Sequence, residues 1–193
     1  MKAMRVLLVD ENAERAGLLK SALHESGYTV SLHVGVMAQL LAQVRAVEPD
    51  VIIIDRDSPD RDTLEHVCMV TRDQPRPIVM FADDGDRMAI RAAVDAGVSA
   101  YVVGGLKAER IRPIVDVAIA RFEQFQAIRQ ELDKAKLSLA ERKQIERAKG
   151  IVMKSRGVSE EEAYGLLRKL AMERNQRIAQ VSENVIAMAE LLT

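Results

Sequence analysis

The chain has 193 residues, of which 48% are hydrophobic and 3% aromatic, and its formal net charge is −1. This length and apolar content allow one domain with a packed core and a smaller appendage, with no need to invoke disorder. No apolar run approaches membrane length, acidic residues rather than a cleavage site follow the first apolar segment, and Cys68 has no partner for an internal disulfide. We therefore expect a cytoplasmic protein that makes no use of a membrane.

Short apolar segments alternate with amphipathic ones over the first part of the chain. The segments typical of strands are residues 4–10, 29–34, 50–55, 77–82 and 100–103. Repeated strand–helix units of this kind predict an α/β domain with a doubly wound, flavodoxin-like parallel sheet over residues 1–120. No glycine-rich turn follows the first strand, which disfavours a dinucleotide site.

Three carboxylates stand at the carboxyl ends of the first and third predicted strands, namely Asp10, Glu11 and Asp55. These strand ends border the ligand crevice of an open parallel sheet, so the carboxylates should converge there. Such a cluster can hold Mg²⁺, and an aspartate beside that ion can accept a phosphoryl group. Residues 4–120 resemble the receiver domain of two-component response regulators. The resemblance implies Asp10 and Glu11 as the metal-binding pair and Asp55 as the phosphoacceptor, the alternative for Asp55 being a strand-end carboxylate without a signalling role.

The chain departs from the receiver pattern at two positions. Receivers carry Thr or Ser at the end of the fourth strand and Lys at the end of the fifth, whereas this chain has Ala82 and Gly104 there. Ala82 cannot hydrogen-bond a phosphoryl oxygen, and Gly104 cannot supply a compensating cation. Lys107 follows three residues too late. We therefore expect a pseudo-receiver that requires no cofactor, with Mg²⁺ possible, and in which phosphorylation of Asp55 lacks the usual means of switching the conformation.

The other polar residues of this region suggest no chemistry of their own. Asp57 is interpreted as a surface loop residue, and the scattered histidines His24, His33 and His66 have neither metal-ligand spacing nor a nucleophile partner. We expect no enzymatic function.

Residues 109–147 contain no glycine and a single proline, Pro113, which predicts one long helix continuing from the last receiver helix. Apolar residues at heptad spacing predict a coiled coil and a parallel homodimer. The predicted seam consists of Ala118, Phe125, Ile128, Leu132, Ala135 and Leu139. Arg121 and Arg142 interrupt the pattern, so packing against the chain's own C-terminal helices is the alternative.

Residues 132–193 are expected to form a three-helix module. Gly157 predicts the end of its first helix, Ser159 and Glu162 form the sequence pattern of a capping box, and a third helix begins near Asn175. The apolar stripes predicted to meet are Ile145, Ala148 and Val152, then Ala163, Leu166, Leu167 and Leu170, then Ile178, Val181, Val185, Ile186, Ala189 and Leu192. We also expect Tyr164 in this core.

Charge is divided unevenly along the chain. Residues 1–109 contain twelve basic and seventeen acidic side chains, whereas residues 142–177 contain ten basic side chains against five glutamates. A basic surface of this kind suits a polyanion, although solvated helix faces are the alternative. The candidate RNA-binding residues are Arg147, Lys149, Arg168, Lys169, Arg174, Asn175 and Arg177. Because Tyr164 is the only ring after Phe125, contacts to phosphates and loop bases are expected rather than extended base stacking.

The C-terminal helices resemble the ANTAR domain of bacterial transcription antiterminators. The matching motifs are Ala148-Lys149-Gly150, Met153, Gly157, Ala163-Tyr164, Leu166-Leu167-Arg168 and Leu170-Ala171-Met172. The combination of receiver, coiled coil and ANTAR module is similar to the nitrate-assimilation and amidase antiterminator family. The segments PIVMF (77–81), GVSAYVV (97–103) and ERIRPIVDVAIARF (109–122) resemble its nitrate-type NasT members most.

That resemblance implies a protein that binds RNA rather than a catalyst. Members of the family capture paired hairpins in a nascent leader mRNA, which prevents a terminator hairpin from forming. An inhibitory protein that senses nitrate or nitrite controls them. This chain would accordingly act as a homodimer on leader mRNA hairpins.

Two other functions remain open. A phosphorylation-dependent response regulator that binds DNA would fit the receiver half, but the third C-terminal helix contains no Lys or Arg after Arg177. A regulator or adaptor that binds a protein partner is the other alternative, against which the basic segment argues.

Overall fold

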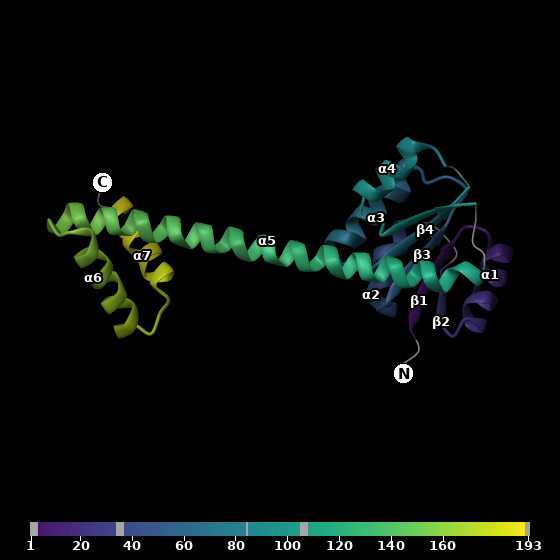
Figure 1. Cartoon of the computed structure of the whole chain (residues 1–193), viewed down its shortest axis with the longest axis horizontal. Coiled ribbons are helices and arrows are strands. Elements are labelled where there is room, and N and C mark those ends of the chain that lie inside the picture. The colour runs from purple at the N-terminus through teal and green to yellow at the C-terminus, as the bar shows by residue number, and fades with distance from the viewer. Residues whose placement is uncertain (1–3, 34–36, 84, 105–107, 192–193) are drawn as a thin grey trace. The chain divides into compact units, whose positions relative to one another are not determined.

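The computed structural model describes residues 4–33, 37–83, 85–104 and 108–191 (Figure 1). The chain divides into two compact units, Met1–Gln126 and Ala127–Thr193. The strands of the first unit are β1 (Arg5–Asp10), β2 (Thr29–His33), β3 (Val51–Asp55), β4 (Ile78–Ala82) and β5 (Ala100–Val103). They pair in parallel in the order β2-β1-β3-β4-β5. This topology confirms the predicted doubly wound sheet.

Helices cover both faces of the sheet. They are α1 (Ala13–Glu25), the 3₁₀ turn η1 (Met37–Gln39) with α2 (Leu40–Val47), α3 (Arg61–Asp73), α4 (Arg87–Asp95) and the start of α5 (Ala108–Arg156). Alternate residues of each strand face opposite sides. Val6 and Leu8 therefore pack with α1 and α5 on one face, while Leu7 and Val9 pack with the helices α2, α3 and α4 on the other. A sheet buried on both sides explains why its strands are continuous apolar runs.

Helix α5 has 49 residues and covers a region for which the sequence predicted two separate helices. The predicted linker helix and the first helix of the C-terminal module form one uninterrupted helix that ends at Arg156, because Gly157 adopts a left-handed conformation with φ of 66°. Neither α5 nor any other helix within the described ranges is apolar enough over a sufficient length to span a membrane.

The second unit closes a small core between the last turns of α5, helix α6 (Glu160–Glu173) and helix α7 (Ile178–Leu191). The capping box at the start of α6 is confirmed, since the Ser159 hydroxyl accepts from the backbone N–H of Glu162 and the Glu162 carboxylate accepts from that of Ser159. The buried core residues are Ala148, Leu167, Ala171, Val181 and Ile186. Residues from all three predicted apolar stripes therefore meet.

Several details of this core differ from the sequence-based prediction, beginning with Leu166, which was assigned to the inward apolar stripe of α6 but is 37% exposed. Tyr164 is 44% exposed, so its assignment to the core was wrong. Ala163 and Leu167 lie one helical turn apart and face inward, and the position directly after Ala163 is rotated about 100° away from them. Ser182, which the apolar pattern passes over, is buried and donates its hydroxyl to the Ile178 carbonyl at 2.8 Å. Leu192 lies outside the described residues.

Candidate functional site

Asp10 and Asp55 meet at the carboxyl edge of the sheet, as predicted. They end the neighbouring strands β1 and β3 and are directly paired in register. Only 1% of Asp10 and 6% of Asp55 is exposed. Two carboxylates that are buried on directly paired residues need a positive charge beside them.

That positive charge is the guanidinium of Arg15, from the first turn of α1. Arg15 Nε lies 3.0 Å from Asp10 Oδ2 and Nη2 lies 3.0 Å from Asp10 Oδ1, which is a bidentate pair. The same group is 3.6 Å from Asp55 Oδ2, and Arg15 Nη1 donates to Asp57 Oδ1 at 2.8 Å. Arg15 thus joins three carboxylates. Neither Arg15 nor Asp57 was identified from the sequence as part of this site.

The turn between β1 and α1 positions Arg15. The Asn12 backbone N–H donates to Asp10 Oδ1 at 2.8 Å, and Asn12 Oδ1 caps α1 by accepting from the N–H groups of Glu14 and Arg15, each at 3.0 Å. The start of the helix is therefore fixed relative to Asp10. A side chain at position 15 can then reach back to the strand ends.

Glu11 does not join the two aspartates. Its carboxylate pairs with the guanidinium of Arg56, the residue directly after β3, and Arg56 also contacts Thr63 and lies 3.5 Å from Asp60. The Glu11 side chain remains 57% exposed. Of the three predicted ligands, two converge and the third is held by a second arginine.

These carboxylates as arranged do not fit Mg²⁺. Magnesium requires oxygen ligands at about 2.0–2.1 Å in octahedral geometry, whereas both Asp10 oxygens are engaged by Arg15. Among the described residues, no group of three or more His, Cys, Asp or Glu side chains is arranged to hold a metal ion. Burial raises the pKa of Asp55 to about 6, Arg15 opposes this increase, and the neighbouring Asp10, Asp83 and Asp57 add to it.

The two atypical receiver positions lie where the sequence placed them. Ala82 ends β4 and is buried, and Gly104 follows β5 with φ of 90°. The Gly104 N–H donates to the Ala82 carbonyl at 3.1 Å. Neither position offers a side-chain donor to the acidic pocket formed by Asp10, Asp55 and Asp57. Lys107 lies outside the described residues.

The predicted RNA-binding side chains of the second unit, with one exception, are exposed. Those on the surface are Arg147, Arg168, Lys169, Arg174, Asn175 and Arg177. Arg147 pairs with Glu190 at 2.7 Å and Arg177 with Glu141 at 3.0 Å, in both cases on the solvent side. Asn175 adopts a left-handed conformation, with φ of 51°, between α6 and α7. Exposed pairs of this kind are weak, so these cations remain accessible to a phosphate.

Lys149 is the exception. Its side chain is buried, and Nζ lies 2.6 Å from Glu160 Oε1 and 2.8 Å from Glu146 Oε1. Hydrogen bonds to Glu146 and Glu160 raise its pKa. Helical periodicity relates Lys149 to Glu146 but could not reveal the contact with Glu160, which comes from the next helix. As placed, Lys149 joins α5 to α6 rather than facing solvent.

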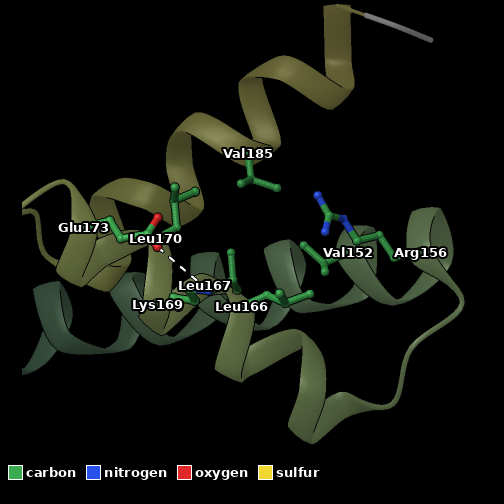
Figure 2. A pocket seen from close by; sticks show the side chains of 8 residues that line it. All are labelled: Val152, Arg156, Leu166, Leu167, Lys169, Leu170, Glu173 and Val185. Carbon is green, nitrogen blue, oxygen red and sulfur yellow. Dashed lines mark ion pairs between the residues drawn. The ribbon is translucent and has the colours of Figure 1, made fainter.

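A groove of about 310 Å³ runs between the three helices of the second unit (Figure 2). Val152, Leu166, Leu167, Leu170 and Val185 give it an apolar lining. Charged side chains border it: Arg156 from the end of α5, and Lys169, which lies 4.0 Å from Glu173. In Figure 2 the Arg156 guanidinium points toward the groove. No sequence pattern indicated this groove.

Most of the predicted dimer seam is exposed. Phe125, Ile128, Leu132 and Leu139 are each 52–60% exposed, and Ala135 is also exposed. The prediction is wrong for Ala118, which is fully buried in the receiver core with Ile111 and Val115. The first turns of α5 use their apolar stripe for packing on the sheet, so a seam on this helix can begin only later.

Comparison with known proteins agrees with the two units. Residues 6–116 match the response regulator receiver domain, and residues 133–186 match the ANTAR domain. The chain is 28% identical over 182 residues to the transcriptional regulatory protein PdtaR of Mycobacterium tuberculosis. The aligned region covers 94% of this chain and 89% of PdtaR. It is 29% identical over 108 residues to the DNA-binding response regulator MtrA of Mycobacterium leprae, but that match covers only 55% of this chain and 47% of MtrA.

Solved structures share the fold of the first unit. A putative response regulator from Chloroflexus aurantiacus superimposes with a TM-score of 0.55 at 25% identity, covering 62% of this chain and 99% of that protein. The chemotaxis response regulator CheY4 of Vibrio cholerae has a TM-score of 0.54 at 21% identity, covering 61% and 99%. The chain therefore belongs to the response regulator receiver family, and its receiver is followed by an ANTAR domain.

Proposed function

We propose that this protein is an RNA-binding transcription antiterminator, which captures paired hairpins in a nascent leader mRNA and prevents a terminator hairpin from forming. The observation that carries the proposal is the exposed basic surface of the ANTAR domain, where six of the seven candidate RNA-binding residues lie in solvent. Cations on a folded surface attract the phosphates of RNA and release its counterions. The small apolar core beneath this surface does not require so many cations above it.

The groove beside this surface supports recognition of RNA that is not fully paired. Arg156 and Lys169 border an apolar lining formed by α5, α6 and α7 (Figure 2). Single-stranded loops expose flat base faces and edges, and proteins read them with apolar contacts and arginine or polar groups. A hairpin loop therefore matches the groove and its cations better than a regular duplex does.

The exposed heptad stripe supports a homodimer. Leaving Phe125, Ile128, Leu132 and Leu139 in water is unfavourable, at about 25 cal/mol per Å² of apolar surface. A parallel coiled coil through these residues would cover them and bring two ANTAR domains to one transcript. Each domain could then bind one hairpin, and the second contact would gain strength from effective concentration.

The transcripts we assign are leaders of nitrate or nitrite assimilation genes, and the control we assign is an inhibitory protein that senses these ions. The PIVMF, GVSAYVV and ERIRPIVDVAIARF segments support this choice within the family. Ala82 and Gly104 support control by a partner, since a phosphoryl group on Asp55 would find no hydroxyl or ammonium at these positions.

A gel-shift titration of the full-length protein tests the proposal. The probes are a two-hairpin leader RNA, the same RNA with one loop scrambled, and a DNA duplex of the same sequence. We expect tight binding to the intact RNA alone. Equal affinity for all three probes would reduce the basic surface to nonspecific attraction, and binding only to the duplex would favour a DNA-binding regulator.

Matched charge variants separate the ANTAR surface from overall charge. Arg168→Ala with Lys169→Ala removes two exposed cations of α6, whereas Arg87→Ala with Arg91→Ala removes two exposed cations of α4 in the receiver. Both pairs change the net charge equally. Loss of RNA binding should follow only the first pair, and an equal loss in both would contradict a site on the ANTAR domain.

A further inference from the structure

Arg15 stands among the carboxylates of the receiver as a divalent ion would. Its guanidinium contacts both oxygens of Asp10 at 3.0 Å, one oxygen of Asp57 at 2.8 Å, and one oxygen of Asp55 at 3.6 Å. Arg15 Nη2 also lies 3.5 Å from the Asp55 backbone carbonyl. These groups come from β1, β3 and the segment after β3, so one side chain links three parts of the acidic edge.

The contacts leave no approach for a metal ion to Asp10. This aspartate is almost completely buried, and its Oδ1 additionally accepts from the Asn12 N–H at 2.8 Å. A cation at ligand distance from either oxygen would overlap the guanidinium, and two cations of this size beside each other would repel strongly in a buried setting.

We infer that Arg15 is the resident cation of this receiver, taking the place of a divalent metal ion and closing the acidic pocket to Mg²⁺. The pair is built in rather than incidental. The capped first turn of α1 fixes the backbone of Arg15, and the planar guanidinium matches the two oxygens of Asp10 in a way that a lysine ammonium could not.

A second arginine completes the exclusion. Glu11, the remaining carboxylate of the expected metal set, is paired with Arg56, which Thr63 and Asp60 hold in turn. The guanidinium groups of Arg15 and Arg56 therefore lie within ion-pair distance of five acidic side chains: Asp10, Glu11, Asp55, Asp57 and Asp60. The charge balance of the pocket does not vary with the concentration of metal ions, which suits a receiver governed by a binding partner.

Titration of the full-length protein with Mn²⁺, followed by electron paramagnetic resonance, tests this directly. The Asp10→Asn, Asp55→Asn double variant gives the background from surface carboxylates. We expect the wild-type protein to bind no more Mn²⁺ than this background, and its thermal midpoint to be the same in Mg²⁺ and in chelator. Additional Mn²⁺ bound by the wild type and lost in the double variant would overturn the inference, whether or not any Arg15 variant folds.

Removal of the guanidinium supplies the complementary test. Arg15→Ala should have a lower thermal midpoint in chelator, should regain stability with Mg²⁺, and should bind Mn²⁺ roughly tenfold or more tightly than the wild type, because a full positive charge has left the carboxylates. Arg61→Ala, which removes an exposed arginine that pairs with Glu65, should show none of these changes. A folded Arg15→Ala protein that binds no metal would mean that Arg15 is not what closes the pocket. Both readouts concern the receiver alone and are independent of RNA binding.

Discussion

The ammonium of Lys149 on α5 lies 2.6 Å from the carboxylate of Glu160 in the first turn of α6. This ion pair bridges the Gly157 turn at a point where the lysine side chain is almost completely buried. Glu160 is itself well placed, because an acidic side chain at a helix N-terminus interacts favourably with the helix dipole. The pair accounts for a basic residue of the ANTAR motif without requiring it to contact RNA.

Lys149→Ala should therefore weaken RNA binding by destabilising the α5–α6 junction. We expect a lower thermal midpoint and a smaller fraction of folded protein that can bind RNA. The dependence of the binding constant on salt should be unchanged, because no phosphate contact is lost. Circular dichroism melting and salt titrations measure the two effects. Lys154→Ala, an exposed lysine on the same helix, should leave the melt unchanged. A flatter salt dependence for Lys149→Ala at unaltered stability would return Lys149 to the RNA contacts.

Arg168 and Lys169 should behave in the opposite way. Both are exposed on α6, and Lys169 has only a 4.0 Å pair with Glu173 within the described residues. Replacing both with Ala should leave the thermal midpoint nearly unchanged and reduce the slope of log K against log salt by about 1.4 if each contacts one phosphate of unpaired RNA. Affinity measured by fluorescence anisotropy across a salt series decides this, and a slope equal to that of the wild type removes both residues from the interface.

Leu132 provides the test of the dimer. Leu132→Asp should give a monomer by sedimentation, and it should reduce affinity for a two-hairpin RNA by roughly 10²- to 10⁴-fold while leaving affinity for a single hairpin unchanged.

Leu137 is a matched control, since it is 60% exposed on the same helix but lies outside the heptad seam. Leu137→Asp should remain dimeric and retain binding to paired hairpins. A monomeric wild-type protein, or equal dissociation in both variants, would contradict a seam through Leu132.

Sequence periodicity was sufficient for most of the fold because burial on a sheet and along a helix each has its own spacing. Val51 to Asp55 lies within one residue of its predicted strand, and Ser159 begins α6 as its capping pattern indicates. The error at Tyr164 arose where a ring follows directly after Ala163, because hydrophobic character alone does not specify the direction of a side chain. Ala118 fitted two apolar patterns at once, and packing on the receiver sheet accounts for it.

The candidate sites were harder to predict because their partners come from distant parts of the chain. Asp10 and Asp55 could be brought together by the rule for parallel strands. The contact of Arg15 with Asp57 spans 42 positions, and no periodicity relates the two residues. Lys149 and Glu160 belong to different helices, so their pairing depends on the angle at which α6 returns along α5.

Ionisation of the Asp55 carboxyl makes the stability of the receiver depend on pH. Burial raises the pKa of this carboxyl from 3.8 to about 6, Arg15 lowers it in part, and Asp10, Asp83 and Asp57 raise it further. The folded protein consequently holds this proton more tightly than the unfolded chain does. The contribution of Asp55 to stability is fully present below about pH 4 and is lost as the pH rises through about 6.

Asp55→Asn, which has no carboxyl proton to lose, should therefore be more stable than the wild type above about pH 6, by roughly 3 kcal/mol, and this advantage should shrink toward pH 4. Urea unfolding of both proteins across this range measures the difference in the free energy of unfolding. Asp95→Asn, an exposed aspartate on α4, should show no comparable change with pH. An Asp55→Asn protein that is less stable than the wild type at neutral pH would mean that attraction between Arg15 and the ionised Asp55 outweighs the cost of burying this carboxylate.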